Sequence, residues 1–324
     1  MSAWVILYCV LAAAGTWLAR RYALHNRLLD HPGERRSHAV ATPRGGGVAI
    51  VVALLVAAIA LALRDPSQRV LLTAVGAGTA LVAGIGMVDD HRPLSPWIRL
   101  LVHGLAGALF ALAVLHVFGE AWLSILAFAA TVGLANIWNF MDGIDGIAAS
   151  QGLMMALALA AVSTGSWLLL AMALAAACLG FLPFNFPRAR IFMGDVGSGA
   201  MGFAIAALAV VAVGNDGIAA MALLLPFSAF LVDAGLTLLR RLLRRERWWE
   251  PHTQHAYQVW ARRSGHTIVT LGYVAWTGLG MAVGAVVRAQ PVAVVLGACV
   301  IWYAAAAVAW WILQRPQPAD GRPT

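Results

Sequence analysis

The sequence has no lysine and little charge of either sign, and both features restrict what the chain is. Only 11% of its 324 residues are charged, whereas 61% are hydrophobic. No polar stretch is long enough to bury a core of its own, which excludes a soluble domain beside the apolar segments. The three cysteines fall inside apolar runs without the spacing of a metal site, so neither a zinc centre nor a disulfide framework is expected.

Long apolar runs occupy most of the chain. Each is about 16–23 residues long, which is near the length that a helix needs to cross a bilayer. They predict an all-α polytopic integral membrane protein, organised as a single transmembrane domain over residues 1–324. We expect about eleven transmembrane helices, at 3–19, 46–63, 70–88, 97–117, 121–138, 147–163, 166–184, 199–213, 217–239, 267–287 and 291–313.

The arginines alternate from loop to loop. Seventeen of the 22 basic residues lie in or beside the loops after odd-numbered spans, while the even-numbered loops hold only Arg64, Arg69 and Arg288. Arginine-rich loops face the cytoplasm, so the N-terminus is predicted to be periplasmic and the C-terminus cytoplasmic. This topology, together with anionic lipid headgroups, explains the net charge of +8, which does not indicate binding to nucleic acid.

Polar side chains recur at every third residue between the fifth and sixth spans, at Asn136, Asn139, Asp142 and Asp145. Polar and ionisable groups at membrane depth are costly, so they indicate function. The carboxylates are hard oxygen ligands of the kind that Mg²⁺ accepts, and Asn139 is predicted to complete such a set or to bind a substrate. The alternative is a polar linker that caps one helix and starts the next.

Three more aspartates are predicted on the same side of the membrane. Asp89 and Asp90 end the third span, where the helix dipole disfavours anions, so a metal ion or an arginine is expected beside them. Adjacent side chains on a helix diverge by about 100°, which predicts different roles for the two. Asp195 lies among glycines just before the eighth span. A solvated turn and a helix N-cap are the alternatives, but gathered carboxylates repel one another unless a cation neutralises them, which favours a divalent metal.

Basic and glycine-rich segments on this side suit phosphate. Three glycines beside arginines enter the second span, where backbone N–H groups at a helix N-terminus attract anions and arginine adds paired donors. The alternative is a basic loop that only enforces topology. The residues predicted here to bind substrate are Arg36, His38, Arg44, Gly46, Asn185 and Arg190.

The longest loop on this side begins with a run of arginines and tryptophans over 240–249, which predicts an amphipathic segment along the lipid headgroups. His252 and His255 follow at a spacing that places two side chains on one helix face. A zinc site would need a third strong ligand nearby, so we favour imidazoles that bind phosphate or a leaving group.

Every unusual polar motif thus falls on one side of the membrane. A transporter needs access from both sides and a site near the bilayer midplane, so this asymmetry favours chemistry at the cytoplasmic face. Aspartates, arginines and histidines together suit phosphoryl transfer between a soluble donor and a lipid. Two alternatives are a lipid or sugar transporter and a CDP-alcohol phosphatidyltransferase, although Asp145-Gly-Ile-Ala148-Ala149 lacks the arginine of the motif of the latter enzymes.

Four ordered motifs between about Arg35 and Gln258 resemble those of a known family, the polyprenyl-phosphate N-acetylhexosamine-1-phosphate transferases of glycosyltransferase family 4. The motifs are Asp89-Asp90, Asn136-x-x-Asn139-x-x-Asp142-Gly-x-Asp145-Gly, Phe192-Met-Gly-Asp195-x-Gly-Ser198 and His252-x-x-His255.

The resemblance implies that a UDP-N-acetylhexosamine donor reacts with undecaprenyl phosphate, with Mg²⁺ or Mn²⁺ as cofactor, in the bacterial inner membrane. It implies a metal site at Asp195, joined in our prediction by Asn139 and Asp89. The predicted catalytic residues are Asp89, Asp90, His252 and His255, and Asn136, Asp142 and Asp145 are predicted to bind substrate. A homodimer is expected from the resemblance alone.

The last loop narrows the resemblance. The branch that transfers phospho-muramoyl-pentapeptide carries three consecutive histidines there, whereas this chain has His252-Thr-Gln-His255. The loop is similar to that of the branch that initiates O-antigen and related surface polysaccharides. We therefore expect N-acetylfucosamine or N-acetylquinovosamine as the sugar, ahead of N-acetylglucosamine.

Overall fold

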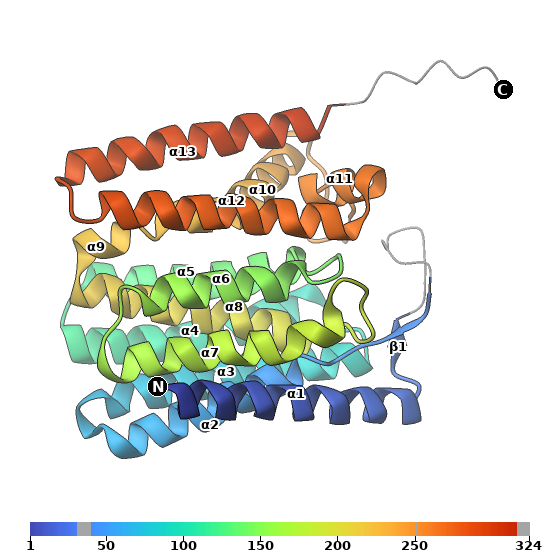
Figure 1. The fold of residues 1–324 in the computed structure, drawn as a ribbon, viewed down its shortest axis with the longest axis horizontal. Coiled ribbons are helices and arrows are strands. Elements are labelled where there is room, and N and C mark those ends of the chain that lie inside the picture. The colour runs from blue at the N-terminus through green and yellow to red at the C-terminus, as the bar shows by residue number, and fades with distance from the viewer. Residues whose placement is uncertain (31–39, 251, 316–324) are drawn as a thin grey trace.

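The computed structural model describes residues 1–30, 40–250 and 252–315, and its regular structure is almost wholly helical (Figure 1). Two short strands, β1 (Leu29–Asp30) and β2 (Thr42–Pro43), pair antiparallel, and the 3₁₀ turn η1 spans Pro66–Gln68. The α-helices are α1 (Ser2–His25), α2 (Val48–Arg64), α3 (Arg69–His91), α4 (Pro96–Phe118), α5 (Ala121–Phe140), α6 (Ile147–Ala160), α7 (Gly165–Asn185), α8 (Asp195–Asn215), α9 (Gly217–Met221), α10 (Leu224–Leu243), α11 (Ala256–Ser264), α12 (His266–Val287) and α13 (Val292–Leu313).

Ten of the eleven predicted spans each coincide with one helix, which confirms an all-α polytopic membrane fold. Among the described residues, eight helices are long and apolar enough to cross a membrane, and α2 and α6 are shorter apolar helices. The predicted ninth span is interrupted: α9 ends at Met221 and α10 begins at Leu224. Pro226 lies in the first turn of α10, where a missing backbone N–H costs least, so the new helix starts just before it.

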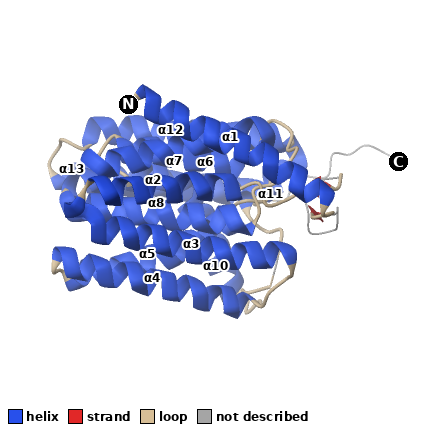
Figure 2. Ribbon diagram, turned by 90° about the horizontal axis from the view of Figure 1, so that it is seen from below, coloured by secondary structure: helices blue, strands red, loops and turns tan. Residues whose placement is uncertain are grey.

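The long helices run side by side, so the loops gather at two ends of the bundle (Figures 1 and 2). The loops after α1, α3, α5, α7 and α10 meet at one end, together with α11 (Figure 1). These are the odd-numbered loops of the sequence, which together hold most of the arginines. The fold therefore brings the predicted site segments to one end of the molecule.

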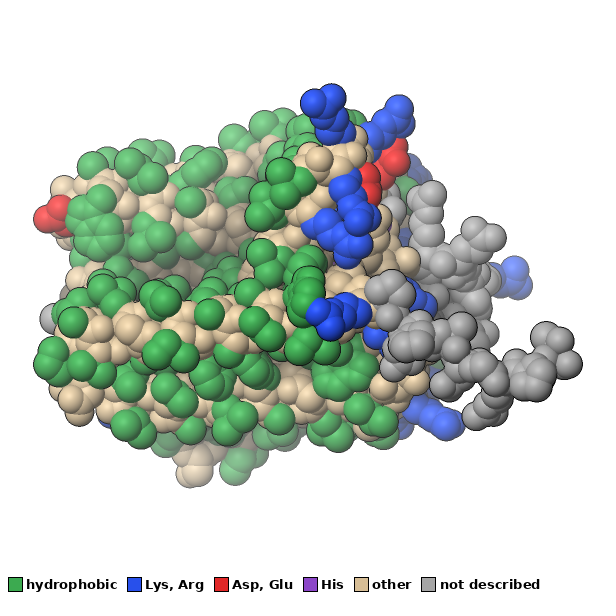
Figure 3. All heavy atoms as spheres, turned by 90° about the horizontal axis from the view of Figure 1, so that it is seen from above, with side chains coloured by type: hydrophobic (Ala, Val, Ile, Leu, Met, Phe, Trp, Pro, Cys, Tyr) green, Lys and Arg blue, Asp and Glu red, His purple; other side chains and the backbone are tan. Residues whose placement is uncertain are grey.

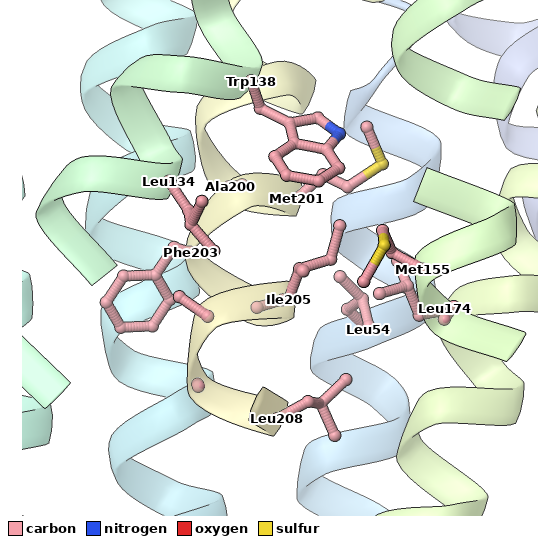
Figure 4. Close-up of a cluster of buried hydrophobic side chains, with 14 of the residues drawn as sticks. Leu54, Leu134, Trp138, Met155, Leu174, Ala200, Met201, Phe203, Ile205 and Leu208 are labelled. Atoms are coloured by element: carbon pink, nitrogen blue, oxygen red, sulfur yellow. The ribbon is translucent and has the colours of Figure 1, made fainter. Parts of the chain in front are cut away.

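Helix α8 lies at the centre of the core, packed against α3 and α5 (Figure 4). In its most apolar 18-residue window, 89% of the residues are buried. Close packing depends on small residues: a side chain at Gly202 would collide with the backbone of Leu134, and one at Gly78 would collide with the ring of Phe203. The N-terminus of α8, where the predicted metal ligand Asp195 lies, is thereby fixed relative to its neighbours.

Candidate active site at the loop-rich end

Asp90 joins the end of α3 to the start of α8. Its side chain is 3% exposed, and its two oxygens accept hydrogen bonds from the backbone N–H groups of Asp195 and Val196, each at 3.1 Å. A carboxylate at a helix N-terminus is stabilised by the helix dipole and the free amides. Gly194 permits the contact, because a Cβ there would lie 2.6 Å from Asp90 Oδ2. The cap of α8 therefore comes from another helix and not from the side chain of Asp195.

Asp89 points to different partners, as the divergence of adjacent helical side chains predicted. Its Oδ2 lies 2.9 Å from Arg99 Nη1, and its Oδ1 accepts the backbone N–H of Leu94 at 2.6 Å. The same Arg99 nitrogen lies 2.6 Å from Asp195 Oδ2. One arginine thus bridges carboxylates from α3 and α8, and it supplies the cation expected beside the aspartate pair.

Arg99 was missed as a site residue in the sequence analysis. The sequence did contain a signal for it, since Arg99 is the only arginine within the predicted fourth span and lies ten residues after Asp89. An arginine inside an apolar segment is costly unless it is paired, so it points to acidic partners.

The loop between α5 and α6 brings a further carboxylate to the same place. Asn139, near the end of α5, donates to the Ser198 hydroxyl of α8 at 3.2 Å. Burial raises the pKa of Asp142 well above its usual range, and the negative charges of Asp195 and Asp90 raise it further. Asn136 donates to the Val132 carbonyl of its own helix at 2.7 Å. Carboxylates from three elements therefore lie within electrostatic reach of one another.

Asp145 is held by the start of α12. Its Oδ2 lies 3.2 Å from His266 Nδ1, and its backbone carbonyl accepts the Thr270 hydroxyl at 2.8 Å. His266 was not predicted as a site residue, because nothing in its local sequence links it to a loop 121 residues earlier.

Asn185 and Gly46 serve mainly to join loops. Asn185 is 3% exposed, accepts the Gly146 N–H at 3.0 Å and donates to the Ile191 carbonyl at 3.0 Å. The Gly46 N–H donates to the Phe192 carbonyl at 2.9 Å, so it is not free to bind phosphate. The glycine run instead permits close packing, because a Cβ at Gly47 would collide with Gly197 Cα of α8. A Cβ at Gly46 would lie 2.8 Å from the Phe181 ring. This corrects our expectation that the Gly46 N–H binds phosphate.

The predicted basic ligands are placed differently from one another. Arg44 donates to the backbone carbonyl of Asp90, and its Nε lies 4.0 Å from Asp90 Oδ1. Arg190 is exposed, donates to the Pro183 carbonyl and lies over the Phe184 ring at 5.1 Å from the ring centroid. Arg36 and His38 lie outside the described residues.

The rings of His252 and His255 are adjacent, with centroids 4.8 Å apart. The spacing had predicted that the two side chains share a helix face, and this was wrong. His252 lies in the loop, and His255 is the N-cap of α11. Burial, followed by the nearby positive charges of His255 and Arg241, lowers the pKa of His252 to about 4, so the ring is neutral near pH 7.

A buried aspartate in α10 holds this histidine segment. Asp233 is 3% exposed and accepts the N–H groups of Ala256 at 2.8 Å and Tyr257 at 3.0 Å, and the Tyr273 hydroxyl at 2.7 Å. His255 Nδ1 lies 3.6 Å from it. The Tyr257 hydroxyl in turn donates to the Phe140 carbonyl at 3.0 Å, which places the histidine segment against the loop that carries Asp142.

The arginine-rich run before the histidines does not form a helix of its own, and its position along the lipid headgroups stays a prediction. Helix α10 continues to Leu243, and a loop follows. Arg241 is 4% exposed and folds this loop back on itself through Glu246 Oε2 at 3.0 Å and the carbonyls of Arg247 and Glu250 at 2.8 and 3.1 Å. A buried guanidinium with several backbone acceptors explains why the segment turns back.

Several carboxylate oxygens at this end are of the kind that Mg²⁺ prefers, although no ready-made metal cage is present. Among the described residues, no group of three or more His, Cys, Asp and Glu side chains is arranged to hold a metal ion. Mg²⁺ is commonly held by one or two carboxylates plus substrate phosphates, whereas structural zinc needs a closed set of four ligands. The mutually repelling carboxylates of Asp142 and Asp195 fit the first mode.

Comparison with known proteins agrees with these features. The model of glycosyl transferase family 4 matches residues 72–213. Over 310 residues the chain is 32% identical to the decaprenyl-phosphate N-acetylglucosaminephosphotransferase of Mycobacterium leprae, covering 79% of this chain and 76% of that protein.

Two further relatives belong to different branches. The probable undecaprenyl-phosphate N-acetylglucosaminyl 1-phosphate transferase of Bacillus subtilis is 28% identical, covering 75% of this chain and 72% of that protein. The phospho-N-acetylmuramoyl-pentapeptide-transferase of Deinococcus radiodurans is 31% identical, covering 74% of this chain and 83% of that protein. The chain therefore belongs to the polyprenyl-phosphate sugar-1-phosphate transferases of glycosyl transferase family 4, and it is a multi-pass membrane enzyme.

Proposed function

We propose that the protein transfers a phospho-N-acetylhexosamine from a UDP-sugar to undecaprenyl phosphate, which gives undecaprenyl-diphospho-sugar and UMP. The observation that carries this proposal is the meeting of Asp89, Asp195 and Arg99 with Asp142 nearby, at the arginine-rich end of a bundle of apolar helices. Such a set of acidic and basic groups suits two phosphates that must approach each other beside a lipid phase.

The reaction that we propose is a direct displacement. An oxygen of the lipid phosphate attacks the sugar-side phosphorus of the donor and forms a new P–O–P linkage. The bond from that phosphorus to the bridging oxygen breaks, and UMP leaves with the electron pair. Any proton on the attacking phosphate passes to a carboxylate at the site.

Asp89 is the better candidate for that base. Both oxygens of Asp90 accept backbone N–H groups that begin α8, and its side chain is only 3% exposed. Asp89 accepts one backbone N–H, its other oxygen pairs with Arg99, and its side chain is 14% exposed. We propose that Asp90 positions α8 and that Asp89 receives the proton. A covalent phospho-aspartate is the alternative, and trapping a sugar-phosphorylated enzyme without lipid acceptor would refute the direct route.

Asp195, Asp89 and Asn139 are the residues that we propose hold Mg²⁺ or Mn²⁺. When bound, the ion supplies positive charge that offsets the donor diphosphate. Arg99 holds Asp89 and Asp195 in place, and we propose that Asp142, Asp145 and Arg190 face the donor. We propose that His252 acts as a neutral ring, since burial lowers its pKa to about 4.

We further propose that the site faces the cytoplasm, because the loops at this end carry most of the arginines. The step would begin O-antigen or related polysaccharide synthesis in a bacterial inner membrane. The sugar stays a prediction: the last loop favoured a 6-deoxy sugar, while two of the three relatives described above are named for N-acetylglucosamine.

The test uses purified full-length protein with undecaprenyl phosphate and a panel of UDP-N-acetylhexosamines. We expect lipid-linked sugar and UMP in equal amounts, with a preference for one donor and loss of activity on chelation of divalent metal. The variant Asp195→Asn, checked for an unchanged melting temperature, should lose activity. Product without UMP release, or activity in the presence of excess chelator, would contradict the proposal.

A further inference from the structure

A groove lies outside this site, between the C-terminal ends of α10 and α13. It has a volume of about 560 Å³, which is within the range of sites that hold small molecules. The two helix ends are joined by hydrogen bonds from Arg240 to Gln314 at 2.9 Å and from Trp310 to the Thr237 hydroxyl at 3.2 Å. The groove is thus a packed feature of two adjoining helices.

The walls of the groove are apolar and exposed on the surface of the helix bundle. Leu236, Leu239 and Leu243 follow one another along one face of α10, and the tryptophans at 310 and 311 oppose them from α13. Leu243 is 76% exposed and Trp311 is 53% exposed. A hydrocarbon chain lying along this surface would cover apolar area that is otherwise unpartnered within the protein.

The rim of the groove is positively charged. Arg240, Arg244 and Arg315 line it, and of the residues that the structure describes, no Asp or Glu lines the groove. The nearby carboxylate of Glu246 is already held by Arg241 at 3.0 Å and by Gln254 at 2.9 Å. Figure 3 shows arginine side chains gathered at one end of this otherwise mostly hydrophobic face. Among the described residues, the rim therefore carries a net positive charge, with Glu246 as an acidic neighbour of Arg244.

The groove lies at the end of a candidate membrane span, where lipid headgroups are expected. Arg315 lies just past the end of α13, a helix long and apolar enough to cross the membrane, and its guanidinium stacks over the Trp311 ring at 3.4 Å. Tryptophan and arginine at a span end are typical of the membrane interface. Arginine binds phosphate through paired hydrogen bonds.

We propose that this groove binds a phospholipid with an anionic headgroup, its acyl chain along the leucines and its phosphate at the arginines. A zwitterionic lipid fits less well, because its cationic group would face three arginines. Gln314 also donates to the Gln254 carbonyl at 2.7 Å, next to the histidine segment, so a bound lipid would steady that segment as well. The site is separate from the residues proposed for catalysis.

The test is a titration of purified protein with phosphatidylglycerol and phosphatidylcholine, with bound lipid counted by native mass spectrometry. We expect phosphatidylglycerol to bind more tightly, and each arginine removed to weaken it about fivefold. Arg244→Gln and the double variant Arg240→Gln/Arg244→Gln probe the rim. Arg21→Gln is the matched control. Arg21 lies near the C-terminal end of α1, at the same loop-rich end of the bundle but away from the groove.

A second variant probes the apolar wall. Leu239→Trp should obstruct the acyl chain and weaken the binding of both lipids, while it leaves the arginines in place. Equal affinity for the two lipids, or affinities unchanged in Arg244→Gln, would overturn the proposal. Displacement of phosphatidylglycerol by undecaprenyl phosphate at equal concentration would also overturn it, because the groove would then belong to the acceptor substrate.

Discussion

Replacing Asp233 by asparagine tests how the histidine segment is held. Each oxygen of this buried carboxylate accepts two hydrogen bonds: Oδ1 from Ala256 N–H and the Thr237 hydroxyl, Oδ2 from Tyr257 N–H and the Tyr273 hydroxyl. Asparagine keeps the size but converts one oxygen to an NH₂ group. Whichever way the amide turns, that group meets a backbone N–H at the start of α11.

The size of the effect follows from those contacts. A hydrogen bond to a charged group contributes about 1.5–3 kcal/mol, and a buried donor without a partner costs about 1–3 kcal/mol. We therefore expect the attachment of α11 to weaken by about 2–3 kcal/mol. Because each 1.4 kcal/mol is a factor of ten, the fall in kcat/KM has an upper limit of about 100-fold.

The assay combines UMP release with hydrogen–deuterium exchange at the amides of residues 256 and 257. In Asp233→Asn, kcat/KM should fall and hydrogen–deuterium exchange at these two amides should rise. Asp65→Asn is the matched control, because Asp65 accepts hydroxyls from Ser67 and Ser166 at the opposite end of the bundle. If exchange and kcat/KM in Asp233→Asn equalled those of the control, the proposed anchoring role would be refuted.

Three other predictions concern the same end of the molecule. Arg99→Gln leaves two carboxylates without their shared cation, so UMP release should fall at least about tenfold, with partial recovery in Arg99→Lys. Gly194→Ala adds a Cβ 2.6 Å from Asp90 at a φ of 76°, whereas Gly119→Ala has a φ of 73° in open space. The melting temperature should therefore fall further for Gly194→Ala, and equal falls would contradict the contact. Finally, His252 has its pKa lowered to about 4 in the folded protein, against about 6.5 when unfolded. The unfolded chain alone takes up this proton as the pH falls from 6.5 to 4, so stability should fall in that window, and His252→Gln should show a smaller fall.

The sequence predicted the helices well because each apolar run has the length of a membrane span. It also predicted that Asp89 and Asp90 would face different partners, because adjacent residues on a helix must diverge. The odd-numbered loops could be assigned to one side because together they hold most of the arginines, although the loop after the fifth span has none, and the structure brings all five to one end. These are local properties, in which a few neighbouring residues determine the outcome.

The partners of the site could not be predicted, because they lie far apart along the chain. Arg99 reaches Asp195 across 96 residues, and His266 reaches Asp145 across 121. Spacing carries no information about such contacts. The prediction that the two histidines share a helix face failed for a related reason. An i, i+3 spacing implies a shared face only inside a helix, and α11 begins at Ala256, after both histidines, where Asp233 accepts its first backbone N–H.

Helix α8 explains why these distant partners converge. It is the most deeply buried of the candidate spans, so its rotation and height are fixed by contacts along its length. Its first residue, Asp195, meets Arg99 of α4, and its first two backbone N–H groups meet Asp90 of α3. A carboxylate accepts both amides only if α3 and α8 keep one register. The core packing of small residues such as Gly78 and Gly202 therefore helps to set the distance between the carboxylates of the candidate site, although these glycines lie far from it.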